Sequence, residues 1–487
     1  MQKSLLERVN VILWWMLLLA LPITSFPPIL RVLGGNSVAP LSLIPLVILA
    51  LTTILPTILK TKRVPVVVTP LLLLFIVGVI ATAAGYFQDF PSFRETATFR
   101  NALEGFLTLI TGVAFFLAPI YMIKSERDLK NSLHFIYIAF GVILLFCLLQ
   151  ASTWLIKDIE YPLHKFQELI SSSGKIFIRR VYGLAFEPSW LAHQLNILFI
   201  PLFLAASYHG FEHSKIKLFR RFSLEVVLLI ASVGLLFLSF SRIGWITGLL
   251  LLAVMLFRWG NRVIDRTDKP GVTYPWWRRL VIWFGLLSFL TVLAIGLGFV
   301  LTKIDPRTVK LFDLERLRNF GFLGWASQLG IAERVVFWMA AYQVYLLHPL
   351  LGVGFGGAGY FFQYVMPSYG FRLPEIAEVI TTGSFIPNAK NLWVRLLSET
   401  GVIGFICFLL WLYVVAKAAF GLEKDTQPVI YRFVGMFGKL SLLALVVEGF
   451  STDTFGLPYF WLVFGIVVAV SRIKPGAEQL IVREERI

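Results

Sequence analysis

The chain has few charged residues for its length. Of its 487 residues, 15% are charged and 57% are hydrophobic, whereas about a quarter of a soluble protein is charged. This shortage excludes an ordinary soluble domain and predicts a protein that crosses the lipid bilayer many times. The apolar stretch Val11–Leu30 is long, contains proline and is followed by further apolar runs, so we interpret it as a span rather than a cleaved signal peptide.

Cysteine is scarce, and the familiar metal and nucleotide motifs are absent. Cys147 and Cys407 lie in separate apolar runs, so we expect core residues rather than a disulfide or a metal site. The sequence contains no Asp-x-Asp pair, no His-Glu-x-x-His motif and no Gly-x-x-x-x-Gly-Lys motif. We therefore expect neither a bound metal nor a cofactor.

What the chain does have is long apolar runs. About twelve of them are long enough to cross a bilayer as helices. They lie near 11–30, 40–60, 66–84, 105–123, 132–155, 190–208, 222–239, 243–257, 279–302, 396–416, 432–448 and 455–471.

Basic residues mark one side of these spans. The net charge is +16, yet no basic module stands apart from the spans, so we expect no nucleic-acid partner. The positive-inside rule instead places the basic loops, and with them both termini, in the cytoplasm. These loops contain Lys60, Lys62, Arg63, Lys124, Arg127, Lys130, Lys215, Lys217, Arg220, Arg221, Arg258, Arg262, Arg266, Lys269, Arg278, Arg279, Arg472 and Lys474. The outward loops are then 85–104, 156–189, 240–242, 303–395 and 449–454.

The outward loop 303–395 is far longer than a turn between spans needs to be. It divides the chain into nine spans at 1–302, the loop itself, and three spans with a cytoplasmic tail at 396–487. Apolar residues at three- and four-residue steps predict an amphipathic helix over 331–347. We therefore expect an all-α polytopic membrane protein of about twelve spans with one large periplasmic loop containing amphipathic helices. Four aromatic residues predict a loop segment on the membrane surface: Trp338, Phe361, Phe362 and Tyr364.

Several arginines fall on the outward side, against the positive-inside rule. Arg242 lies in a minimal connection between two spans, where a charge is expensive unless it has a partner. A snorkelling contact with lipid phosphate is the alternative for this residue. Arg334 lies on the polar side of the predicted helix, and Arg180 begins a second polar segment. Because arginine offers paired donors to phosphate oxygens, we predict that these three arginines bind a lipid-linked pyrophosphate.

Two carboxylates lie at the outer ends of spans. Glu187 stands at the mouth of one span, where compensation of the positive helix N-terminus is the alternative explanation. Glu399 lies just inside another span, where a hydrogen bond to a neighbouring helix explains it nearly as well as function does.

At these residues the chain resembles the O-antigen ligase and O-antigen polymerase superfamily of bacterial envelope glycosyltransferases. Ser241-Arg242 resembles its Ser-Arg step, and Arg334 with Trp338 resembles its Arg-x-x-x-Trp helix. The run His348–Gly354 resembles its His-Pro-Leu-Leu-Gly-x-Gly element, and Glu399-Thr400-Gly401 begins a Glu-Thr-Gly span like that of the family. Arg180 followed by Glu187-Pro188-Ser189 is similar to a pattern of the polymerase-like members.

The resemblance implies a metal-independent glycosyl transfer on the periplasmic face of the bacterial inner membrane. The donor it implies is a glycan on undecaprenyl pyrophosphate, whose anomeric carbon is attacked by an acceptor hydroxyl. Arg242 and Arg334 match the family arginines thought to hold the pyrophosphate, in agreement with the electrostatic argument. The implied partners are this lipid-linked glycan and the bilayer; a chain-length regulator is a further candidate that no residue pattern indicates.

One residue departs from the family pattern. Ligases have a histidine where this chain has Lys390, and a lysine of ordinary pKa cannot accept the acceptor's proton near neutral pH. Lys390 is therefore predicted to bind phosphate or sugar oxygens, with Glu187 or Glu399 as the base, or with no strong base needed. This favours a polymerase that joins repeat units to each other. A ligase that transfers glycan to a lipid core or a protein, and a lipid-linked sugar flippase or secondary transporter, remain alternatives.

Overall fold

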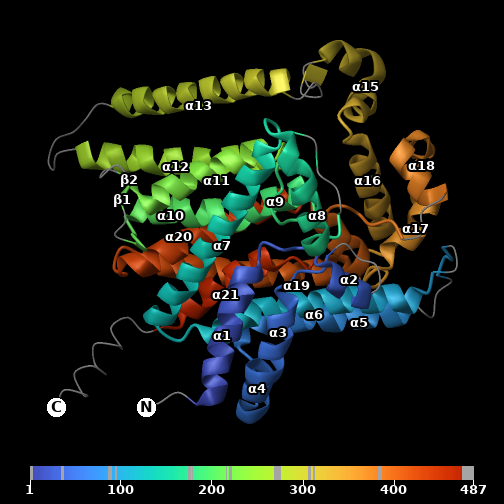
Figure 1. The fold of residues 1–487 in the computed structure, drawn as a ribbon. Helices are drawn as coiled ribbons and strands as arrows, with labels where there is room; N and C mark the ends of the chain where they lie inside the picture. Colours follow the sequence, from blue (N-terminus) through green and yellow to red (C-terminus); the bar gives the residue numbers. More distant parts are fainter. Residues whose placement is uncertain are drawn as a thin grey trace.

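The computed structural model describes residues 4–33, 38–85, 90–93, 96–173, 177, 179–214, 217–218, 222–267, 276–304, 309–310, 313–381 and 386–473. The described part is almost entirely helical, which confirms the all-α prediction (Figure 1). Its two short strands, β1 (Lys217–Leu218) and β2 (Phe222–Ser223), pair antiparallel. Five basic residues used to predict orientation lie outside the described residues: Lys215, Arg220, Arg221, Lys269 and Lys474.

The described chain forms a series of helices before the predicted large loop. They are α1 (Leu5–Ala20), α2 (Pro27–Leu33), α3 (Leu43–Leu49), η1 (Ala50–Ile54), α4 (Leu55–Thr61), η2 (Val66–Val68), α5 (Thr69–Gly85), α6 (Thr98–Met122), α7 (Glu126–Ser152), η3 (Lys157–Ile159), α8 (Glu160–Ile170), α9 (Pro188–Gln194), η4 (Leu195–Phe199), α10 (Ile200–His209), α11 (Leu224–Leu238), α12 (Arg242–Thr267) and α13 (Trp276–Ile304).

The remaining helices include five within the predicted loop. They are α15 (Leu314–Gln328), α16 (Ala332–Leu347), α17 (Ala358–Val365), η6 (Ser368–Arg372), α18 (Pro374–Thr381), α19 (Leu392–Leu422), α20 (Val429–Glu448) and α21 (Pro458–Ser471).

Eight helical segments of the described chain are long and apolar enough to cross a membrane. They are Leu43–Thr61, Val66–Gly85, Thr98–Met122, Glu126–Ser152, Pro188–His209, Arg242–Ile264, Leu392–Leu422 and Val429–Glu448. Each coincides with a predicted span, whereas the predicted spans at 222–239 and 455–471 correspond to shorter apolar helices, α11 and α21. The predicted first span is divided, since α1 ends at Ala20, just before Pro22, and α2 begins at Pro27. The total of twelve spans therefore stays a prediction.

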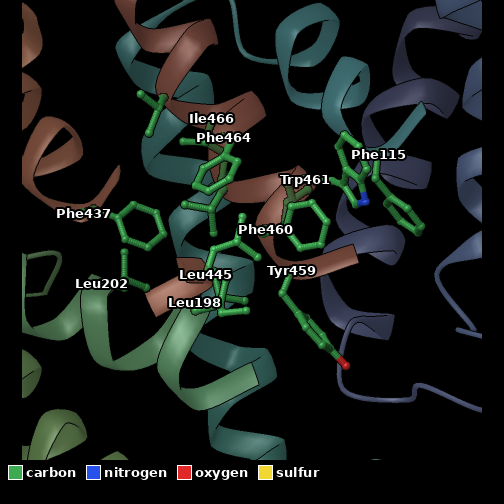
Figure 2. Packing of buried hydrophobic residues seen from close by; sticks show 14 of the residues in the cluster. Phe115, Leu198, Leu202, Phe437, Leu445, Tyr459, Phe460, Trp461, Phe464 and Ile466 are labelled. Carbon is green, nitrogen blue, oxygen red and sulfur yellow. The ribbon is translucent and has the colours of Figure 1, made fainter. Parts of the chain in front are cut away.

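The core of the bundle is built around α21. Its residues from Pro458 to Val470 are all buried, as expected for a helix that is apolar on every side. Figure 2 shows the rings of Phe460 and Phe464 beside residues of α20 and of the η4–α10 segment. The indole of Trp461 lies 4.7 Å from that of Trp411 in α19, measured between ring centroids. A short helix can thus be central because its neighbours enclose it.

The described part of the predicted large loop is mostly helical. The predicted helix over 331–347 is confirmed as α16, which ends at His348. Helices α16, α17 and α18 stand together at one end of the molecule (right in Figure 1). The prediction that Phe362 lies on the membrane surface is wrong, because this side chain is fully buried and packs against Phe337 of α16. It supports a small second core rather than a membrane contact.

Helix α19 is broken at Gly401, and the glycine-rich loop after α16 fills the break. Gly401 has φ 62°, and a Cβ there would meet the Leu350 carbonyl oxygen at 2.1 Å. The amides of Val402 and Ile403 donate to the carbonyls of Pro349 and Leu350, at 2.8 and 3.3 Å. In return, the carbonyls of residues 398 and 399 accept from the amides of residues 353 and 354, at 3.0 and 2.9 Å. The family-like elements at 348–354 and 399–401 are therefore one interlocked unit.

Candidate functional site

Arg180 contacts the turn that comes directly before Arg242 and α12. The Arg180 guanidinium donates to the Ser239 carbonyl at 3.1 Å from Nε and to the Phe240 carbonyl at 3.2 Å from Nη2. Phe240 has a left-handed backbone (φ 52°), uncommon for an aromatic residue, and this turn leads directly into Arg242. The structure thus brings together two predicted site residues that are 62 positions apart in the sequence (242 − 180).

The start of α16 links Arg242 to Arg334. Arg242 Nη1 donates to the carbonyl of Leu329, in the turn that precedes α16. Arg334, in the first turn of α16, donates from Nη1 to both the carbonyl oxygen and the Oγ of Ser451, each at 3.1 Å. All three arginines are half-buried. They gather where α12, α16 and α19 begin and α20 finishes, and we call this the site end of the bundle.

Lys390 lies at the same end, directly before α19. Its backbone is left-handed (φ 51°), a conformation that is rare for lysine and often found at functional sites. Its amide donates to Asp453 Oδ2 at 2.8 Å, and its ammonium group pairs with Glu375. The following residue, Asn391, caps α19 by accepting from the amides of residues 393 and 394. The cap fixes where the helix begins and therefore where Lys390 stands.

Asp453 is a site residue that the sequence reasoning missed. It lies in the short loop between α20 and α21, where its carboxylate accepts from Lys390 and its carbonyl accepts from Arg395. Arg395 also pairs with Glu399, with 3.0 Å between Nε and Oε2. The sequence contains one indication that Asp453 could belong to the site, because it is an acidic residue in a predicted outward loop of only six residues, 449–454.

The two predicted catalytic carboxylates occupy different environments. Glu399 is only 5% exposed and is held by Arg395 inside the first turns of α19. Glu187 is half-buried at the start of α9, where its carboxylate accepts from the Ser189 hydroxyl. Helix α9, which follows Glu187, packs on the first turn of α12 through Ala192, beside Gly244. Within the described chain, the Glu187 carboxylate accepts a hydrogen bond from the Ser189 hydroxyl, and the Glu399 carboxylate pairs with the Arg395 guanidinium.

The geometry of the arginines suits an anionic ligand. Arg180, Arg242 and Arg334 each donate to backbone carbonyls, and a carbonyl orients a guanidinium without cancelling its charge. Guanidinium groups can bind phosphate oxygens through paired donors. Among the residues that the structure describes, no group of three or more His, Cys, Asp or Glu side chains could hold a metal ion.

Comparison with known proteins supports the resemblance read from the motifs. No curated protein matches the chain. Residues 227–409 match the protein-family model described as O-antigen ligase, a range that includes Arg242, Arg334, Lys390 and Glu399. The matched family is one of glycosyltransferase type, and the match together with the apolar helices indicates a multi-pass membrane protein. This match, at residues 227–409, supports the similarity to the O-antigen ligase and O-antigen polymerase superfamily.

Proposed function

We propose that the protein polymerises glycan repeat units carried on undecaprenyl pyrophosphate. The observation that carries this proposal is the gathering of Arg180, Arg242 and Arg334 at one end of the bundle, each oriented by backbone carbonyls. A lipid-linked pyrophosphate has its charged group at the membrane surface, where such a cluster can reach it. The positive-inside pattern supports a periplasmic position for this end, with both termini in the cytoplasm of a bacterial inner membrane.

In the proposed reaction, a hydroxyl of one repeat unit attacks the anomeric carbon of the glycan on a second lipid. The new glycosidic bond forms as the bond between that carbon and the pyrophosphate oxygen breaks. The hydroxyl proton leaves to a base or to water, and undecaprenyl pyrophosphate departs with the electron pair. The arginines stabilise the negative charge that grows on the leaving group, which is the largest single contribution in many enzymes. That the reaction needs no metal follows from the family resemblance.

Glu187 is the better candidate for the base. A general base must reach the hydroxyl proton within hydrogen-bond distance, directly or through one water molecule. Glu399 is almost fully buried and already held by Arg395, so an acceptor sugar cannot approach it without breaking that pair. Glu187 is half-buried and accepts from a hydroxyl, which a sugar hydroxyl can replace. We assign Glu399 to holding the broken helix and Lys390 to binding phosphate or sugar oxygens.

The experiment that tests this function uses purified protein and undecaprenyl-pyrophosphate-linked repeat units as the only substrate. A gel ladder of longer lipid-linked glycans is the expected product, since a polymerase needs no second acceptor. Transfer that occurs only after a lipid core or a protein is added would establish the ligase alternative. No transfer under either condition would contradict both, and would make a flippase or secondary transporter the leading explanation.

A further inference from the structure

Beneath the site end, a polar cluster is buried among apolar helices. It consists of His193, Asn196 and Glu448, whose side chains are 2%, 0% and 0% exposed. His193 belongs to α9, Asn196 to the π-helical turn η4 and Glu448 to the last position of α20. Ionisable groups inside spans are costly and usually functional, and π turns occur often at functional sites. The sequence reasoning passed over all three residues.

One amide group joins two helices at this point. Asn196 Nδ2 donates to Glu448 Oε1 at 2.6 Å and to the carbonyl of Gly244 at 2.9 Å. His193 Nδ1 lies 2.5 Å from Glu448 Oε2, although the two groups are poorly aligned for a hydrogen bond. The Asn196 bonds are therefore the well-formed link, and His193 provides a close polar neighbour for the carboxylate.

The two segments joined by Asn196 are those that carry the arginines. Gly244 is in the first turn of α12, two residues after Arg242. The carbonyl of Glu448 accepts from the amides of Ser451 and Thr452, at 2.9 and 3.1 Å. This turn presents the Ser451 oxygens that hold Arg334. The cluster thus connects the anchor of one arginine to the anchor of the other.

We infer that Asn196 and Glu448, with His193 beside them, are positioning residues that set the spacing between Arg242 and Arg334. The catalytic consequence rests on the proposed function, in which both arginines hold one pyrophosphate. A displacement of about 1 Å in such a site can lower turnover by about 100-fold. Well-packed apolar residues often stabilise a protein as much as a buried polar cluster does. A role in geometry therefore explains this cluster better than stability alone.

The test compares variants that keep or remove the link. Asn196→Leu removes both donated bonds with little change in volume, and Glu448→Leu removes the acceptor. Glu448→Gln keeps an oxygen for Asn196 but removes the charge. Ser441→Ala is the matched control, because Ser441 is equally buried on α20 but bonds to the Phe437 carbonyl of its own helix. Asn196→Ala replaces Asn196→Leu if the leucine variant does not fold.

Two measurements are made on each variant. The first is the distance distribution between spin labels on α12 and α20, attached at Ile246→Cys and Val446→Cys, which are 58% and 49% exposed. Cys147 and Cys407 are replaced by alanine in this background. The second is the rate at which longer lipid-linked glycans form. The distance measurement needs no substrate, so it reports on the link even if the proposed function is wrong.

We expect Asn196→Leu and Glu448→Leu to broaden the distance distribution and to lower turnover by about 100-fold. Glu448→Gln and Ser441→Ala should resemble the wild type in both measurements. Unchanged distances in the leucine variants would overturn the inference, as would a Glu448→Gln variant with wild-type distances and the activity of Glu448→Leu. Broadened distances in the leucine variants, combined with a wild-type protein that transfers no glycan, would support the link and reject the proposed function.

Discussion

Two sets of cations in the bundle are held in different ways. At the end opposite the site, Glu423 follows α19 and its side chain is 5% exposed, with Oε1 2.7 Å from Arg258 and Oε2 2.6 Å from Lys439. At the site end, Arg180, Arg242 and Arg334 are oriented by backbone carbonyls. A carboxylate neutralises the cation that it binds, whereas a carbonyl only directs it. The first arrangement fastens helices together, and the second fixes the direction in which the guanidinium groups point.

Substitution of Arg334 is the strongest test of this difference between the two sets of cations. We expect Arg334→Ala to lower glycan transfer by about 100- to 1000-fold, because a donor aimed at leaving-group charge is lost. Arg334→Lys should fall between this variant and the wild type, since lysine keeps the charge but not the paired donors. The rate of ladder formation and the level of membrane-inserted protein are measured together.

The matched control is Arg372→Ala, because Arg372 is exposed on η6 and is expected to be solvated. Its activity should equal that of the wild type. Wild-type chain lengths in Arg334→Ala and in the corresponding Arg242→Ala variant would remove the pyrophosphate assignment altogether.

At the opposite end, loss of the carboxylate should affect stability instead of chemistry. Glu423→Gln leaves Arg258 and Lys439 without their anionic partner, and removal of one member of a buried pair costs about 3 kcal/mol. We expect a lower midpoint of thermal unfolding in detergent, with unchanged transfer per folded molecule. A variant that keeps its thermal midpoint but loses activity would show that the two ends are not functionally separate.

The same carboxylate predicts a dependence on pH. Burial on its own raises the pKa of Glu423, but the nearby His209 and Lys439 side chains, with the charge of Arg258, outweigh it and lower the pKa to about 2. Because this pKa is lower in the folded protein, the ionised group stabilises the fold above its ordinary pKa of 4.5 and ceases to do so as pH falls toward about 2. The difference in thermal midpoint between wild type and Glu423→Gln should therefore shrink below about pH 5. A difference that widens on acidification would contradict this sign.

The smallest expected effect is at Lys390. We expect Lys390→His to be tolerated better than Lys390→Glu by about tenfold in transfer rate, or about 1.4 kcal/mol. Only the glutamate reverses the charge beside the proposed phosphates and beside Asp453, whose oxygen accepts from the residue 390 amide. Equal rates for the two variants would exclude Lys390 from the site.

The sequence was most informative where a pattern is local. Apolar length predicted the eight candidate spans, and helical periodicity predicted α16 to within one residue of its start. Local pattern also directed attention to Arg180, Arg242 and Arg334, which the structure does bring to one end. It failed for Phe362, because an aromatic residue on an amphipathic helix fits a membrane surface and a small core equally well.

What could not be predicted depends on partners far apart in the chain. Asp453 acquires its setting from Lys390 and Arg395, 63 and 58 positions away. Asn196 and Glu448 are separated by 252 positions, and each by itself reads as an isolated polar residue in an apolar run. Pairings of this kind become visible only when the helices are packed. Local sequence patterns therefore give no sign of the buried polar contacts that join distant helices.

The interlocked break in α19 has a consequence for how the protein is made. Residues 349–354 are synthesised before α19, and they replace the hydrogen bonds that the break at Gly401 removes from this helix. Unpaired amides cannot face lipid without a large cost. The nascent helix can therefore settle in the membrane only together with the segment that precedes it. A variant with an insertion or deletion in residues 349–354 or next to Gly401 should therefore fail to insert correctly. Such a protein should be degraded before any effect on catalysis could be observed.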